Sequence, residues 1–151
     1  MSAGRVLGVD YGTRRVGLAL SDGLGVAAHP YTVIDAPGAA ARIAEIAKAE
    51  DVTHIVVGLP TGLGGDEGPS ALGARALADE IRNIVSVPVA LADERFTSKI
   101  AERALLEGDV RRRQRKERID KVAAAVMLQA VLDKPGGVES LDDGHADTSD
   151  V

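Results

Sequence analysis

The order of the apolar segments constrains the fold of this chain more than any other feature. Three strand-like runs come first, and the short connections between them predict antiparallel neighbours. Two further strand-like runs alternate with helical patterns, which predicts parallel strands in the same sheet. We therefore expect an α/β protein with a five-stranded mixed sheet, three strands antiparallel and two parallel, flanked by helices. The predicted strands cover residues 5–10, 15–21, 26–34, 54–59 and 87–92, and the predicted helices cover 37–50, 70–85, 97–108 and 118–133.

Two of the expected helices have apolar stripes that predict which side faces the core. Residues three or four apart lie on the same face of a helix. The first stripe consists of Ile43, Ile46 and Ala47, and the second consists of Leu77, Ile81 and Ile84. We expect both stripes to be buried.

Composition restricts the class of protein. With 151 residues, of which 45% are hydrophobic, the chain suits one folded domain. It has no cysteine, which excludes disulfides, thiol catalysis and thiolate metal ligands. No apolar run reaches the roughly 18 residues that a membrane span needs, and no secretory signal pattern opens the chain. We therefore expect a cytoplasmic protein without a membrane partner.

The net charge of −5 comes from the end of the chain. Five of the 23 acidic residues lie in residues 139–151, which hold no lysine or arginine, and the preceding residues carry as many bases as acids. Low apolar content and clustered like charge are typical of disordered segments. We expect a folded domain over residues 1–138 and an acidic, disordered tail over residues 139–151.

Acidic residues stand at two places where an α/β sheet gathers its ligands, near the carboxyl ends of parallel strands, and at the start of the last helix. Asp10 ends the first predicted strand, Asp93 and Glu94 follow the fifth, and Asp120 begins the last helix on a face of small residues. Singly, each has an ordinary interpretation: a turn, a solvated strand end, or an acid favoured by the helix dipole. Together they could bind hard cations, because oxygen ligands suit Mg²⁺ or Mn²⁺. Two such ions can support hydrolysis of a phosphodiester bond.

Basic residues accompany these acids. Lysine and arginine neutralise the phosphates of a nucleic acid, although a run of bases is often only a solvated surface. With 2% aromatic residues, stacking of bases on aromatic side chains is not expected to be the main binding mode. The candidate nucleic-acid-binding residues are Thr13, Arg14, Arg15, Arg95, Arg111, Arg112, Arg113, Arg115, Lys116 and Arg118.

Four sequence blocks, in order, resemble the signatures of the YqgF/RuvX family over about residues 5–133. The blocks are DYGTRRVG at 10–17, VGLP at 57–60, DERFTS at 93–98 and IDKVAA at 119–124. The resemblance implies an RNase H-like fold and a nuclease that depends on Mg²⁺ or Mn²⁺. It also implies a role in 5′-end processing of pre-16S ribosomal RNA during ribosome biogenesis, or in resolving Holliday junctions in DNA.

The same resemblance assigns roles to the acids. Asp10, Glu94 and Asp120 would be the catalytic residues of a two-metal site, with Asp10 bridging the ions and the other two each binding one. Asp93 stays open as the strand-end ligand, because adjacent residues of an extended strand point to opposite faces. Tyr11 and Arg14 stand where an apolar or aromatic residue and a lysine are common in the family, and neither replaces an acid.

Other functions are compatible with the sequence. Asp-x-Gly-Thr at residues 10–13 also resembles the phosphate-binding turn of actin, hexokinase and sugar-kinase proteins, which would make this an ATP-binding domain. A third interpretation is a non-catalytic RNA-binding module that has kept the fold. The sequence does not separate structured RNA from branched DNA as the substrate, nor a monomer from a weak homodimer.

Overall fold

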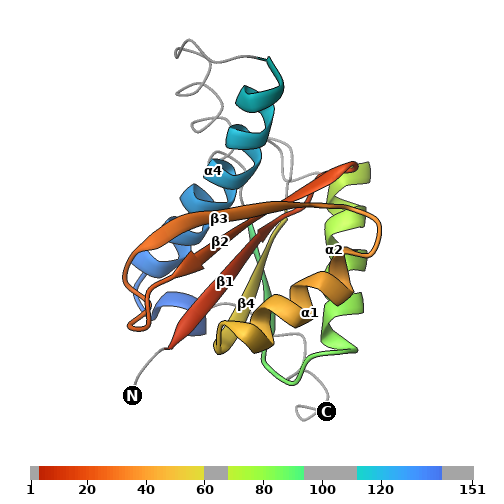
Figure 1. Ribbon diagram of the computed structural model, residues 1–151. Helices are drawn as coiled ribbons and strands as arrows, with labels where there is room; N and C mark the ends of the chain where they lie inside the picture. Colours follow the sequence, from red (N-terminus) through yellow and green to blue (C-terminus); the bar gives the residue numbers. More distant parts are fainter. Residues whose placement is uncertain (1–3, 60–67, 94–111, 141–151) are drawn as a thin grey trace.

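A five-stranded sheet forms the middle of the molecule, in the order β3-β2-β1-β4-β5 (Figure 1). The computed structural model describes residues 4–59, 68–93 and 112–140, with only the backbone course for Asp93, residues 112–120 and residues 139–140. The elements are β1 (Arg5–Asp10), β2 (Arg15–Ser21), β3 (Ala28–Asp35), α1 (Ala39–Ala49), β4 (Val52–Leu59), α2 (Pro69–Arg82), β5 (Val89–Asp93), α4 (Arg112–Asp133) and the 3₁₀ helix η1 (Gly137–Ser140).

The strand directions agree with the expectation from sequence. β1 pairs antiparallel with β2, and β2 pairs antiparallel with β3. On its other side β1 pairs parallel with β4, and β4 pairs parallel with β5. The carboxyl ends of β1, β4 and β5 therefore share one edge of the sheet, and the two candidate strand-end acids, Asp10 and Asp93, are the last residues of β1 and β5. This RNase H-like arrangement confirms the predicted fold class.

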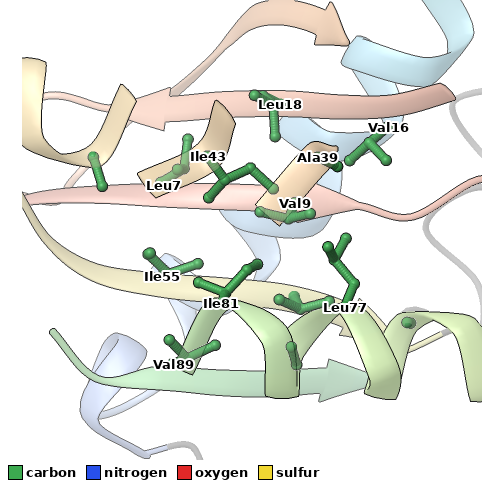
Figure 2. Close-up of a cluster of buried hydrophobic side chains, with 14 of the residues drawn as sticks. Leu7, Val9, Val16, Leu18, Ala39, Ile43, Ile55, Leu77, Ile81 and Val89 are labelled. Carbon is green, nitrogen blue, oxygen red and sulfur yellow. The ribbon is translucent and has the colours of Figure 1, made fainter. Parts of the chain in front are cut away.

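Helices cover both faces of the sheet and create two cores. On one face, α1 and α2 bury the alternate residues of the strands, among them Leu7, Val9, Ile55 and Val57 (Figure 2). On the other face, α4 packs over β2, β3 and β1 and buries a second set. The members of that second core include Val6, Ala19, Val56, Ala92, Ala124, Met127, Leu128 and Val138. No helix in the described ranges is long and apolar enough to cross a bilayer.

A glycine lets α4 approach the central strand closely. A Cβ atom added to Gly8 would lie 3.0 Å from the Leu128 Cβ and 3.5 Å from the Ala124 carbonyl oxygen. A larger residue at position 8 would therefore push α4 away from the sheet. α4 runs downward in Figure 1 while β1 runs upward, so the earlier turns of α4 lie toward the carboxyl end of β1.

The third strand begins later than predicted, at Ala28, because a side chain organises the residues before it. The Asp22 carboxylate accepts hydrogen bonds from the backbone N–H groups of Leu24, Val26 and Ala27. Three such bonds satisfy the turn without strand pairing, which explains why residues 26 and 27 stay outside β3.

The second helix ends earlier than predicted, and one assignment to the core is wrong. Leu77 and Ile81 are buried as expected, whereas Ile84 is 53% exposed. α2 ends at Arg82, and the N–H groups of Ile84 and Val85 both donate to the Ile81 carbonyl. This tighter turn carries Ile84 off the helical stripe. The first helix keeps its predicted stripe of Ile43, Ile46 and Ala47, all buried.

The last helix is longer than predicted. It starts at Arg112 instead of 118, so most of the arginine-rich segment belongs to α4. The helix expected over residues 97–108 lies outside the described residues. The 139–151 tail is described only at residues 139–140, which belong to η1.

Candidate active site at the carboxyl edge of the sheet

Asp10 lies at the carboxyl end of the central strand, half-buried, between two glycines. Its register partner on β2 is Gly17, and its partner on β4 is Gly58. Neither neighbouring strand therefore places a side chain beside this carboxylate. Register partners on adjacent strands lie about 4.8 Å apart, so a side chain at either position would stand next to Asp10, and the two glycines supply none.

The face of the sheet that carries Asp10 follows from the alternation of β1. Val6 packs in the second core, Gly8 lies under α4, and Leu7 and Val9 pack in the first core. Alternate residues of a strand share a face, so Asp10 belongs to the face that α4 covers.

The helix that carries Asp120 crosses this same face. Ala124 and Leu128 are the nearest residues to Gly8, which lies two positions before Asp10 in β1. Two strand residues span about 7 Å, and the four residues from Ala124 back to position 120 span about 6 Å of helix. Because α4 and β1 run in opposite directions (Figure 1), the helix positions before Ala124 lie toward the carboxyl end of β1, where Asp10 is the last residue. The backbone thus brings these two candidate positions to one region of the fold.

The last strand completes the edge. Ala92 of β5 pairs with Gly58, which in turn pairs with Asp10, and Asp93 pairs with Leu59 one position further along. Glu94 lies outside the described residues. In the part of the chain whose side chains are described, no group of three or more Asp, Glu, His or Cys residues could hold a metal ion, and Asp10 is the one predicted ligand in that part.

The turn after Asp10 is held by close contacts. A Cβ on Gly12 would meet the Arg15 carbonyl oxygen, so only glycine fits there. The Arg14 carbonyl accepts a hydrogen bond of 2.9 Å from the Ala36 N–H, which ties the turn to the end of β3. The Tyr11 ring lies against Gly73 of α2.

The predicted basic residues fall into three groups. Thr13 and Arg14 are exposed in the turn after Asp10, and Arg15 begins β2 and is half-buried. Positions 112, 113, 115, 116 and 118 lie in the first half of α4, where only the backbone is described. Arg95 and Arg111 lie outside the described residues.

A separate hollow on the molecule does not belong to this site. A cavity of about 450 Å³ lies between β3 and α1, lined by Tyr31, Thr32, Arg42, Glu45, Ile46 and Ala49. Its lining includes none of the residues from Asp10 to Arg15. The hydroxyl of Tyr31 donates a 3.2 Å hydrogen bond to Glu50, and the pKa of Tyr31 is raised by partial burial and by that carboxylate. The lining itself holds one arginine, Arg42, and one carboxylate, Glu45.

Reasoning from the sequence missed three glycines that shape the site. Gly17 and Gly58 lie inside apolar strand runs, where glycine often marks a close approach of backbone or ligand. Gly73 lies inside α2, where glycine is less favourable than alanine by about 1 kcal/mol. In each case a glycine stands where a strand or helix favours another residue, and that exception was the signal that the sequence offered.

Known structures place the fold in a class. The structure resembles RuvC of T. thermophilus, solved in complex with a Holliday junction substrate, with a TM-score of 0.53 at 15% sequence identity. The match covers 83% of this chain and 92% of that chain. Together with the strand order and an acid ending the central strand, this likeness defines a protein with the RNase H-like fold.

Sequence comparisons narrow the class to a family. Residues 4–134 match the family model described as "RuvX: Holliday junction resolvase". A relative from Myxococcus xanthus (strain DK1622), named "Putative pre-16S rRNA nuclease", is 43% identical over 85% of this chain and 87% of its own. A relative of the same name from Moorella thermoacetica is 43% identical over 87% of this chain and 96% of its own. The chain belongs to the RuvX family of nucleases.

Proposed function

We propose that this protein is a divalent-metal-dependent nuclease that processes the 5′ end of pre-16S ribosomal RNA. Relatives that it resembles over most of their length carry the name "Putative pre-16S rRNA nuclease". The single observation that carries the metal dependence is the position of Asp10 between Gly17 and Gly58, on the face that α4 crosses. A carboxylate at a sheet edge whose two register partners are glycines suits a cation that also contacts substrate phosphate.

The donor set fits Mg²⁺ or Mn²⁺. Asp10, Glu94 and Asp120 would hold the ions through their carboxylate oxygens. When bound, the ions would offset the negative charge of the phosphodiester and lower the pKa of a water molecule. The protein's part is to hold the carboxylates in place and to orient the nucleic acid against them.

Strand alternation supports Glu94 over Asp93 as the strand-end ligand. Ala92 packs in the α4-side core and pairs through Gly58 with Asp10. Positions two apart in a strand share a face, so a strand continuing beyond Asp93 would place residue 94 on the face of Asp10. Position 93 would then belong to the opposite face of the sheet from Asp10.

The bases would hold the substrate through its backbone. Thr13 and Arg14 are exposed in the turn that directly follows Asp10. Positions 112–118 belong to the part of α4 that precedes Asp120, on the same side of the molecule as the carboxyl edge (Figure 1). Contacts from both places would position phosphates without reading base sequence.

A second candidate function is cleavage of branched DNA, because the matching family model carries the description Holliday junction resolvase. Symmetric resolution of a four-way junction needs two active sites. A dimer in solution would therefore be required for this activity, whereas processing of an RNA end needs one site.

The test compares matched substrates. A structured RNA with a 16S-type 5′ extension, a four-way DNA junction and an unbranched duplex would be incubated with Mg²⁺, with Mn²⁺ and with chelator. We expect shortening of the RNA extension with either metal and none with chelator. Cleavage of the junction alone would move the second function ahead, and undiminished cleavage in chelator would exclude the metal-dependent mechanism.

A further inference from the structure

Gly73 occupies a helical position that would ordinarily suit alanine. It lies within α2, between Leu72 and Ala74, and Ala71 and Ala74 on the same helix are fully buried. Glycine weakens a helix interior because its backbone has more freedom to lose, so its presence in a helix rich in alanine needs a reason.

The reason is the ring of Tyr11. A Cβ built on Gly73 would lie 2.5 Å from two ring carbons of Tyr11, Cε2 and Cζ, and 2.6 Å from its hydroxyl oxygen. Non-bonded carbons in proteins pack at about 3.5–4.0 Å, so the ring and an alanine side chain cannot both occupy this place. Tyr11 packs against the first core, on the α2 side of the sheet.

One peptide bond joins Tyr11, which makes this contact, to Asp10 of the proposed site. Tyr11 follows Asp10 directly, and the planar peptide between them transmits a displacement of one residue to the other. Tyr11 packs on the face of the sheet that α2 covers, while Asp10 belongs to the face that α4 covers. The contact with α2 therefore holds in place the residue that directly follows Asp10 at the end of β1.

We infer that Gly73 is a positioning residue for Asp10, acting through Tyr11: the bare helix backbone at position 73 receives the ring and holds the end of β1 in place. The inference rests on the proposed function, because it assigns Asp10 to the metal site. It adds a determinant of that site on α2, which supplies none of the predicted ligands.

The experiment is a double-mutant cycle of the parent, Gly73→Ala, Tyr11→Leu and the double variant. A leucine is shorter than the tyrosine ring and leaves space for an alanine methyl. Gly23→Ala is the matched control, since a Cβ at Gly23 meets nothing within 4 Å. Each protein is measured for kcat and KM of RNA cleavage, for the Mn²⁺ dissociation constant, and for Tm in chelator.

We expect Gly73→Ala to lower kcat by about 10- to 100-fold, the range expected when a reacting group is misplaced by about 1 Å. The Mn²⁺ dissociation constant should rise. The KM for RNA should change less than kcat, because the phosphate contacts proposed for α4 lie away from Tyr11. In the Tyr11→Leu background the same change should alter kcat by less than about twofold, since the clash is gone. The control should match the parent.

Other results would overturn the inference. Parent values of kcat and Mn²⁺ affinity in Gly73→Ala would show that the ring does not transmit the change. Equal losses in both backgrounds would show that Gly73 acts on the helix alone. If Gly73→Ala does not fold, the double variant should fold, and its failure to do so would also count against the inference. If the parent protein binds Mn²⁺ but cleaves no RNA, the proposed function is wrong. The Mn²⁺ dissociation constants of the four proteins would still test the inference about Gly73.

Discussion

Asp10 and Gly58 face each other as register partners on adjacent parallel strands. Gly58 is buried and pairs on its other side with Ala92. The neighbours of Asp10 on the side toward β5 are therefore two small residues. This is the side from which a strand-end ligand following β5 would approach.

A larger side chain at position 58 should impair the proposed metal site. We expect Gly58→Val to weaken Mn²⁺ binding and to lower the cleavage rate at least about tenfold, which corresponds to about 1.4 kcal/mol. The added methyl groups should also destabilise the fold by about 1–3 kcal/mol through overpacking. Mn²⁺ titration and cleavage assays on the folded variant measure the first effect, with Gly23→Val as a control in open space. Unchanged Mn²⁺ affinity would mean that ligands reach Asp10 from another direction.

The charge of Asp10 should matter more than its shape. Asp10→Asn nearly preserves volume, yet it removes the negative charge proposed to bridge two cations, so cleavage should fall by orders of magnitude. In chelator the variant should be at least as stable as the parent, because carboxylates that converge without metal repel one another. Thermal unfolding and a gel-based cleavage assay test both statements. Asp51→Asn serves as a control at the opposite edge of the sheet, and retention of full activity by Asp10→Asn would exclude the proposed site.

The arginine-rich segment that includes the start of α4 should bind phosphates without regard to base sequence. Changing Arg111, Arg112 and Arg113 to alanine should weaken nucleic-acid binding and make its salt dependence shallower. Each lost phosphate contact should reduce the slope of log K against log salt by roughly 0.7–0.9. Fluorescence titrations at several salt concentrations measure that slope. Lys48→Ala, an exposed base on α1, should leave it unchanged, and an unchanged slope in the triple variant would leave the arginines as solvated surface.

Two truncations separate the acidic tail from the folded part. Removing residues 141–151 should leave Tm within error, because that composition cannot form a core. Removing residues 137–151 also deletes Val138, which is 8% exposed and packs in the α4-side core. Burial of a valine contributes about 1.5–3 kcal/mol, so Tm should fall by several degrees. A large fall with the shorter truncation would show that the tail packs on the domain.

The Asp22 turn should make stability depend on acid pH. Backbone N–H groups, that of Val26 foremost, lower the pKa of the Asp22 carboxyl below its ordinary value. A lowered pKa in the folded state adds stability above the unfolded-state pKa, and this is lost as the pH falls through the folded-state value. The Tm difference between the parent and Asp22→Asn should therefore be largest near pH 7 and shrink below about pH 4. A difference independent of pH would assign the turn's stability to the hydrogen bonds alone.

The sequence alone predicted the five strands of the described sheet and their mixed pairing, and it indicated the candidate acids. Strand and helix periodicities are local properties, written within a few neighbouring residues, so the apolar runs identified all five strands. Short connections dictated antiparallel pairing at the start of the chain, and the helical crossovers dictated parallel pairing afterwards. The motifs around Asp10, Glu94 and Asp120 indicated the family that the comparisons confirmed.

Tertiary structure alone decided what surrounds those residues. The contacts that shape the site join residues from different elements. Asp10 pairs with Gly17 and Gly58, Ala124 packs near Gly8, and the Tyr11 ring contacts Gly73. Ile84 fits the helical stripe by spacing, but its exposure depends on a turn at the end of α2. Such contacts depend on register and on helix–sheet approach, which are set by the packing of the whole molecule and not by any local pattern.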